Sequence, residues 1–173
     1  MNIQFLLIGW KVVASLPLDN SALTDTLVED FGVRIGAAMG WPPMAGRAAG
    51  VLILSETPMT MQHLQLALDA SKGSVSETTR LLVSTGTVER FKEQGSRQFV
   101  YRWREDAWIG CLQHQLEQTQ DLLALAETAQ RQGAGLPPAQ QGRLRAMHGY
   151  YSFMVERLAL LLSEYSEHVA NSS

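Results

Sequence analysis

The chain has a single cysteine, Cys111, among its 173 residues. A lone cysteine excludes an intramolecular disulfide and a zinc site built from several cysteines, and it is consistent with a reducing compartment such as the cytoplasm. Charged residues make up only 18% of the chain, and the net charge is -3. Because no low-complexity polar tract is present, we expect one continuous folded unit rather than extended disorder.

The chain also lacks the motifs of common catalytic and metal sites. Its four histidines are scattered, and neither a His-Glu-x-x-His pair nor a phosphate-binding glycine loop is present. Cys111 and His114 form an isolated C-x-x-H pair without the further ligands that zinc requires. We therefore predict that the protein is not an enzyme and needs no cofactor or metal.

The N-terminal segment has an apolar run that is too short to span a bilayer. Lys11 interrupts this run after Phe5–Trp10, and no basic region precedes it as in an export signal. We interpret residues 1–21 as an N-terminal extension, and we expect a cytoplasmic protein that is not associated with a membrane.

The most informative segment is residues 71–103, SKGSVSETTRLLVSTGTVERFKEQGSRQFVYRW. It predicts a helix, a strand, a turn and a second strand. Ser71 is suited to cap the helix because its hydroxyl can accept from a free backbone N–H, and Gly86 can adopt the left-handed conformation that ends a helix.

This helix has an apolar face and a polar face. Val75, Thr79, Leu82 and Val83 share the face that we expect to be buried. The remaining surface carries short hydrogen-bonding side chains beside two cations, which is suited to the major groove of DNA. The residues predicted to contact DNA from this helix are Ser71, Lys72, Gly73, Ser74, Ser76, Thr78 and Arg80.

The two strands predict a basic β-hairpin. Phe99, Tyr101 and Trp103 alternate with polar or smaller residues, which indicates a strand with one apolar face. Residues 71–104 hold seven Lys or Arg and three Asp or Glu, whereas the segments on either side are net acidic. We predict that Arg90, Lys92 and Arg97 of this basic wing also contact DNA. The alternative is an ordinary helix and hairpin whose charges only solvate a surface.

Three further helices are expected before this segment, within a DNA-binding domain over residues 22–104. Ala22 to Gly40 has apolar residues at helical spacing, and Gly32, Gly36 and Gly40 predict close helix packing. Residues 44–55 predict a buried helix. Thr60 is expected to cap a third helix, the first of a helix-turn-helix pair, with His63 where Glu or Gln would complete a capping box.

Residues 105–173 predict a helical dimerisation region. The first long helix runs from Glu105 to Arg131, and the second runs from about Ala139 to His168. Apolar residues recur along the second helix in steps of three and four, as in a coiled-coil seam: Leu144, Met147, Tyr151, Met154, Leu158, Leu161 and Tyr165. We interpret this seam as joining two chains. The alternative is that it packs within its own chain.

The sequence resembles the MarR-type winged-helix regulators, and within them the GbsR-like group. The resemblance rests on Phe31-Gly32, on the segment from Trp41 to Ser55 (WPPMAGRAAGVLILS) and on the start of the polar helix, Ser71 to Ser76. It covers about residues 24–131. Thr79 departs from the group pattern, since an aliphatic core residue is usual there.

This resemblance implies a mainly α protein with a small β-hairpin wing and a winged helix-turn-helix fold. It also implies a dimeric transcriptional regulator, often a repressor, that responds to a small molecule bound between the DNA-binding and dimerisation parts. A two-fold dimer would bind an inverted-repeat operator in double-stranded DNA. Trp41, Trp108, Tyr150 and Tyr151 could form an aromatic cage for a quaternary ammonium effector. The alternative function is a winged-helix protein-interaction module that does not read DNA.

Overall fold

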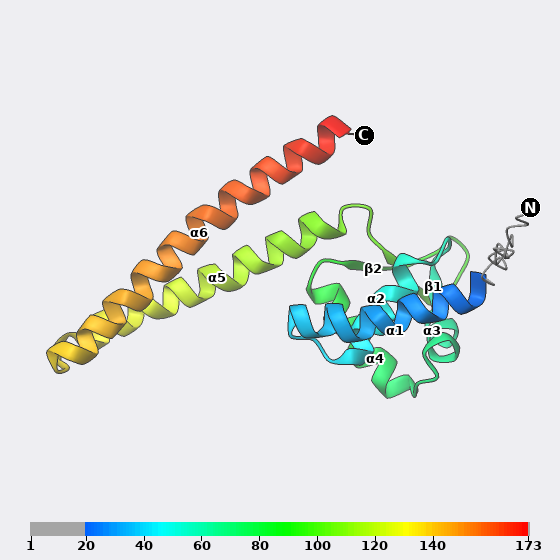
Figure 1. Ribbon diagram of the computed structural model, residues 1–173, viewed down its shortest axis with the longest axis horizontal. Helices are drawn as coiled ribbons and strands as arrows, with labels where there is room; N and C mark the ends of the chain where they lie inside the picture. The colour runs from blue at the N-terminus through cyan, green and yellow to red at the C-terminus, as the bar shows by residue number, and fades with distance from the viewer. Residues whose placement is uncertain (1–19, 173) are drawn as a thin grey trace, which may run out of the picture.

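The computed structural model describes residues 20–172 and is mainly helical (Figure 1). Residues 1–19, which make up most of the predicted N-terminal extension, lie outside the described residues. The elements in chain order are α1 Asn20–Met39, α2 Pro43–Ile53, β1 Met59–Thr60, α3 Met61–Leu68, α4 Lys72–Ser84, β2 Val88–Lys92, β3 Phe99–Trp103, α5 Ala107–Gln132, the 3-10 turn η1 Gly133–Gly135 and α6 Pro138–Ser172. None of the described helices is long and apolar enough to cross a bilayer.

α1 and α2 pack closely through glycines. A Cβ atom added to Gly46 would lie 2.6 Å from the Phe31 carbonyl oxygen, and one added to Gly36 would lie 3.3 Å from the Trp41 carbonyl oxygen. The expected close packing is confirmed at Gly32 and Gly36. It is wrong at Gly40, where a Cβ would meet nothing within 4 Å. Gly40 instead follows the end of α1 with a φ of 66°, a conformation that favours glycine.

The core of the lobe formed by α1 to β3 lies beneath α4. Its buried residues come from α2, α3, α4 and the sheet: Ala48, Ala49, Leu52, Leu64, Leu68, Val75, Leu82, Val88 and Tyr101. Val75 and Leu82 are fully buried, because they lie two helical turns apart on the inner face of α4. The core therefore holds one face of α4 and leaves the opposite face outward.

A small antiparallel sheet closes the lobe, with the strand order β1-β3-β2. Val88 pairs with Trp103 and Lys92 pairs with Phe99, so β2 and β3 form the expected hairpin. The third strand, β1, pairs Met59 with Tyr101. β1 could not be predicted from the sequence, because a two-residue strand has no periodicity that could indicate it.

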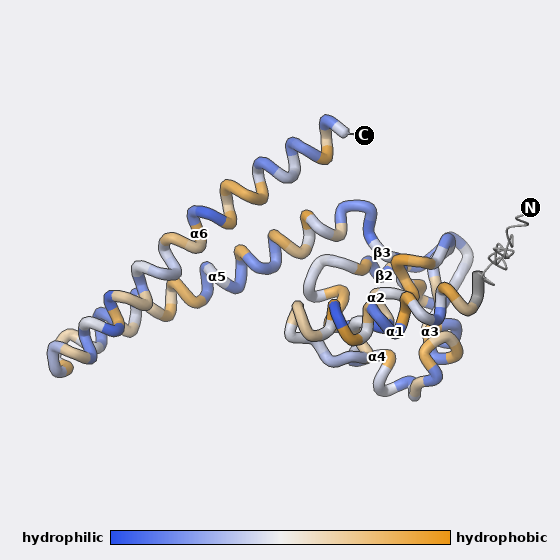
Figure 2. Tube along the Cα trace, in the orientation of Figure 1, coloured by the Kyte–Doolittle hydropathy of each residue, from blue (hydrophilic) through white to orange (hydrophobic). Residues whose placement is uncertain are grey.

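α5, η1 and α6 form an antiparallel helical arm that extends away from the lobe (Figure 1). The first turn of α5 touches the lobe backbone to backbone, since a Cβ on Gly86 would lie 2.9 Å from the Gly110 carbonyl oxygen. α6 runs back along α5 and then diverges from it toward the C-terminus. Figure 2 shows that hydrophobic residues continue along the diverging part of α6.

Candidate nucleic-acid interface

α3 and α4 each have a side-chain cap at the N-terminus, and together they orient the outer face of α4. The backbone N–H of His63 donates to the Thr60 hydroxyl at 3.1 Å at the start of α3, and the N–H of Ser74 donates to the Ser71 hydroxyl at 3.3 Å at the start of α4. Between the helices, Asp69 has a φ of 48° and ends α3 in the left-handed region. Both predicted caps are confirmed, and the caps and turn together orient α4.

The outward face of α4 carries charge of both signs. Lys72, Gly73, Glu77 and Arg80 are exposed on it, and Ser76 is half-buried beside them. These residues follow the helical spacing of one face. They combine hydrogen-bond donors with one carboxylate acceptor, and such a mixed set can distinguish base edges in a major groove.

Two residues of α4 lie on the opposite side from the one predicted. Thr78, expected to contact DNA, is only 7% exposed, whereas Val83, expected in the core, is 38% exposed. Thr78 is buried because it follows Val75 and precedes Leu82 on the inner half of the helix. We therefore remove Thr78 from the candidate interface.

The wing holds two cations against one aromatic ring. The guanidinium carbon of Arg90 lies 3.5 Å from the centroid of the Phe99 ring, and the Lys92 ammonium lies 4.8 Å from it. Arg97 is exposed beyond the turn at Gly95, whose φ is 82°. Stacking on the ring limits the freedom of Arg90 and Lys92 while leaving their charge available to an anion.

Other cations near the wing are already paired. Arg102 donates from Nε to a Glu89 carboxylate oxygen at 2.7 Å. Arg104 donates two hydrogen bonds of 2.7 Å to Asp106, and these bonds lower the pKa of Asp106 and raise the pKa of Arg104.

Five cations of this region have no acidic partner among the described residues: Lys72, Arg80, Arg90, Lys92 and Arg97. All five are exposed, on α4 or on the wing. They match the cations that the sequence analysis selected. Unpaired, exposed cations of this kind are suited to phosphate contacts.

A cleft of about 250 Å³ separates α4 from the wing. Ser76, Arg80 and Val83 of α4 line one side, and Arg90 and Tyr101 line the other. Tyr101 is 5% exposed, and its hydroxyl has no hydrogen bond to any described residue. Arg80 and Arg90 thus share one small cavity with a nearly buried phenol.

A second cavity, of about 230 Å³, lies where α1 and the sheet meet the first turn of α5. Three tryptophans, Trp41, Trp103 and Trp108, line it together with Ile35 and Cys111. The Trp103 and Trp108 rings meet edge to face at 5.6 Å. Burial raises the pKa of the Cys111 thiol, so the thiol form is favoured at neutral pH. We refer to this cavity as the tryptophan pocket.

The predicted aromatic cage does not form within the chain. Trp41 and Trp108 both line the tryptophan pocket, but Tyr150 and Tyr151 belong to α6 and contact each other at 5.2 Å instead. Arg34 also lines the pocket, and its positive charge disfavours a quaternary ammonium ligand. The four residues therefore form no cage within one chain, and the tryptophan pocket is suited to an apolar guest.

Within one chain, the predicted dimerisation seam faces α5. Leu158 is 6% exposed, and Leu144 packs at the turn so closely that a Cβ on Gly133 would lie 2.6 Å from it. Met147, Tyr151, Met154 and Tyr165 are half-buried on the same face, whereas Leu161 is 46% exposed. Within one chain, most of the seam thus packs against α5, and its role in joining two chains stays a prediction.

The arm also carries exposed apolar residues outside this seam or at its edge. Its exposed residues are Leu122 and Leu125 on α5, and Tyr150, Phe153, Leu160 and Leu161 on α6. Arg157 stacks on Phe153 at 5.3 Å. We refer to these six residues as the outer arm face.

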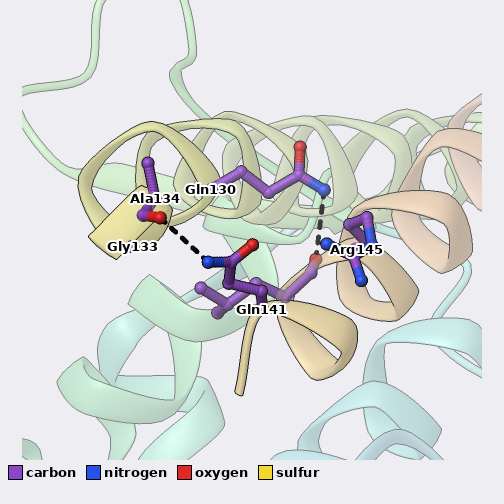
Figure 3. Close-up of a pocket in the computed structure, with 6 residues that line it drawn as sticks. Gln130, Gly133, Ala134, Gln141 and Arg145 are labelled. Atoms are coloured by element: carbon purple, nitrogen blue, oxygen red, sulfur yellow. Dashed lines mark hydrogen bonds between the residues drawn. The ribbon is translucent and has the colours of Figure 1, made fainter. Parts of the chain in front are cut away.

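The cavity at the tip of the arm is part of the turn (Figure 3). Gln141 donates from Nε2 to the carbonyl oxygens of Ala134 and Leu136 at 2.9 and 2.8 Å, and Gln130 donates to that of Leu144 at 3.4 Å. The Gln130 bond links α5 to α6, and the Gln141 bonds join α6 to the turn, so these side chains serve the turn.

Cys111 and His114 have no additional metal-ligating side chain grouped with them among the described residues. Both line a groove of about 400 Å³ between the end of α1 and the first turns of α5. Among residues 20–172, no group of three or more His, Cys, Asp or Glu could hold a metal ion.

Two residues of the interface were missed by the sequence analysis. Glu77 is not among the contact residues selected from the sequence, although its position four residues after Gly73 and three before Arg80 places it on the same face. Tyr101 was assigned only to the apolar face of its strand, and nothing in the sequence indicates that its hydroxyl lacks a partner.

Comparison with known proteins relates both parts of the chain to transcriptional regulators. A family model described as an MmpR5-like MarR family transcriptional regulator matches residues 106–168, which form the arm. A crystal structure described as a transcriptional regulator superposes with a TM-score of 0.77 and 27% identity, covering 83% of this chain and 98% of that one.

Two curated proteins are also similar. The HTH-type transcriptional regulator MmpR5 of Mycobacterium tuberculosis is 29% identical over 125 residues, which cover 72% of this chain and 76% of that protein. The HTH-type transcriptional repressor OpcR of Bacillus subtilis is 30% identical over 67 residues, which cover 39% of this chain and 36% of that protein.

Proposed function

We propose that the chain is a DNA-binding transcriptional regulator of the MarR type, and that it is a dimeric repressor controlled by a small apolar molecule. The family match over residues 106–168 and the similarity to MmpR5 and to a solved transcriptional regulator support this proposal. It binds an inverted-repeat operator, and it has no catalytic activity of its own. Its site of action is the cytoplasm, where bacterial regulators meet DNA. Membership of the GbsR-like group stays a prediction.

The division of the cations into paired and unpaired sets is the observation that carries the proposal. Arg102 and Arg104 are neutralised by acids, whereas the five unpaired cations lie together on α4 and the wing. In the complex, α4 enters the major groove, and Arg97 reaches the adjacent minor groove or its backbone. The revised contact set is Ser71, Lys72, Gly73, Ser74, Ser76, Glu77, Arg80, Arg90, Lys92 and Arg97.

The outer arm face supports a dimer. Phe153 and Leu160 are about half exposed, at 55% and 49%, on a helix with only one buried residue, Leu158. Covering such a face with the same face of a second copy removes apolar surface from water. A two-fold dimer then presents two α4 helices to half-sites about 10 base pairs apart.

The tryptophan pocket supports control by an apolar effector. It lies beside Gly86 and Gly110, where the end of α4 meets the arm. The arm and lobe can take one arrangement that fits DNA and another that does not. A guest that binds the second arrangement more tightly weakens operator binding. The pocket's lining supports a neutral, aromatic or aliphatic molecule rather than a cation.

Selection from a library of random duplexes tests the proposed function. The wild-type protein should enrich an inverted repeat, and the enriched duplex should shift in a native gel at lower protein concentration than a scrambled duplex. Failure to enrich any sequence would instead support the protein-interaction module.

A further inference from the structure

The cleft between α4 and the wing has the features of an anion site. Arg80 and Arg90 line it from opposite sides, and neither has an acidic partner among the described residues. The guanidinium of Arg90 is held over the Phe99 ring at 3.5 Å, which orients it before any ligand arrives.

Tyr101 provides the second, independent observation. Its side chain is 5% exposed and lines the cleft, and its hydroxyl has no hydrogen bond to any described residue. The ring is buried while the hydroxyl opens onto the cleft, so it is free to donate to an acceptor that enters the cleft. An anionic oxygen in the cleft would accept from the hydroxyl and from the two guanidiniums.

The position of the cleft identifies the source of this anion. One sugar–phosphate strand separates the major groove of DNA from the adjacent minor groove. A protein with α4 in the first groove and Arg97 at the second must straddle that strand, and the cleft lies between these two elements.

We propose that the cleft binds one backbone phosphate of DNA in each half-site, held by the Tyr101 hydroxyl and by Arg80 and Arg90. Tyr101 and Arg90 thereby fix the register between α4 and the wing. The proposal rests on the proposed function, because it requires α4 and the wing to occupy neighbouring grooves.

A scan with neutral phosphates tests this contact. The duplex enriched by the wild-type protein is synthesised as a series in which one phosphate at a time is a methylphosphonate, and affinities are measured by fluorescence anisotropy. At one linkage in each half-site, we expect the wild-type protein to lose about tenfold in affinity, as for a lost charge-assisted hydrogen bond.

Tyr101→Phe removes only the hydroxyl and keeps the buried ring. This variant should bind the unmodified duplex about tenfold more weakly than the wild type does. A methylphosphonate at that linkage should lower the affinity of the variant only slightly further. Arg90→Gln, a change at an exposed position, should behave in the same way and serves as the second variant. Arg102→Gln is the matched control, because Arg102 lies on β3 but is paired with Glu89; it should follow the wild-type profile within about twofold.

Three results overturn the proposal. Equal losses for wild type and Tyr101→Phe at every linkage show that the hydroxyl contacts no phosphate. A flat scan, with inorganic phosphate binding to the free wild type but not to Tyr101→Phe, assigns the cleft to a small anion. Absence of any enriched duplex removes the proposed function and this inference together, whereas the first two results leave the proposed function standing.

Discussion

The hydroxyl of Thr79 on α4 illustrates how a polar group is accommodated in the core. Thr79 is 2% exposed, and its hydroxyl donates to the carbonyl oxygens of Val75 at 2.8 Å and Ser76 at 3.2 Å. The hydroxyl is therefore satisfied by its own helix, which explains how threonine occupies a core position.

Replacing Thr79 by valine should leave stability unchanged or slightly higher. Valine keeps the shape, and the two carbonyl groups are helical acceptors already, so the free energy of unfolding should change by less than about 1 kcal/mol. Thr79→Ala is the comparison and should cost about 1–2 kcal/mol, because it leaves a small void. Urea unfolding of both variants decides; a larger loss for valine than for alanine would contradict the role given to the hydroxyl.

Sequence patterns predicted which side chains are exposed better on the wing than on α4. Arg90, Lys92 and Arg97 were selected from charge alone, and all three are exposed without an acidic partner among the described residues. On α4, Thr78 and Thr79 are chemically identical neighbours about 100° apart around the helix. From the sequence, Thr78 was therefore placed on the surface and Thr79 in the core. Only the packing of α4 on α2, α3 and the sheet shows that both are buried.

At the scale of elements, α6 has two apolar faces and the sequence indicated only one of them. The regular spacing of Leu144, Tyr151 and Leu158 pointed to a coiled-coil seam, and within one chain this face packs against α5. Periodicity shows that a face is covered without showing which partner covers it. The outer arm face has less regular spacing and was therefore overlooked.

The two faces should respond differently to charge. Leu158→Asp buries a carboxylate between α5 and α6, so it should lower the free energy of unfolding by several kcal/mol. Phe153→Asp combined with Leu160→Asp changes residues that are exposed in one chain, so the arm should stay folded while the dimer dissociates. Thermal melts and sedimentation velocity measure the two effects.

Glu156→Gln, at another exposed position of α6, is the control for these variants and should remain dimeric. A wild-type monomer at micromolar concentration, or a double variant that still sediments as a dimer, would rule out the outer arm face as the dimer contact.

At the scale of the whole molecule, the tryptophan pocket connects effector binding to the orientation of α4. A neutral aromatic dye, N-phenyl-1-naphthylamine, should bind the wild-type protein and weaken its affinity for the enriched duplex. By linkage, saturating duplex should weaken dye binding by the same factor. Dye fluorescence and anisotropy titrations measure the two sides of this cycle.

Substitutions of Trp108 and Tyr150 test whether a guest binds in the tryptophan pocket or at the four-residue cage. Trp108 and Tyr150 are similarly exposed, at 50% and 58%, but only Trp108 lines the pocket. Trp108→Ala should therefore reduce dye affinity, and Tyr150→Ala should leave it unchanged. Equal effects of the two substitutions, or dye binding that leaves duplex affinity unaltered, would argue against the pocket as the effector site.

The central claim is that the outward face of α4 reads base sequence, and Glu77 tests it most directly. A glutamate accepts from the amino group of cytosine, whereas glutamine pairs with adenine through two hydrogen bonds. Parallel selections with the wild type and Glu77→Gln should therefore yield inverted repeats that differ at one symmetric position, with a preference changed by about 1–3 kcal/mol. Identical motifs from the two proteins, or no motif from either, would contradict sequence reading by α4.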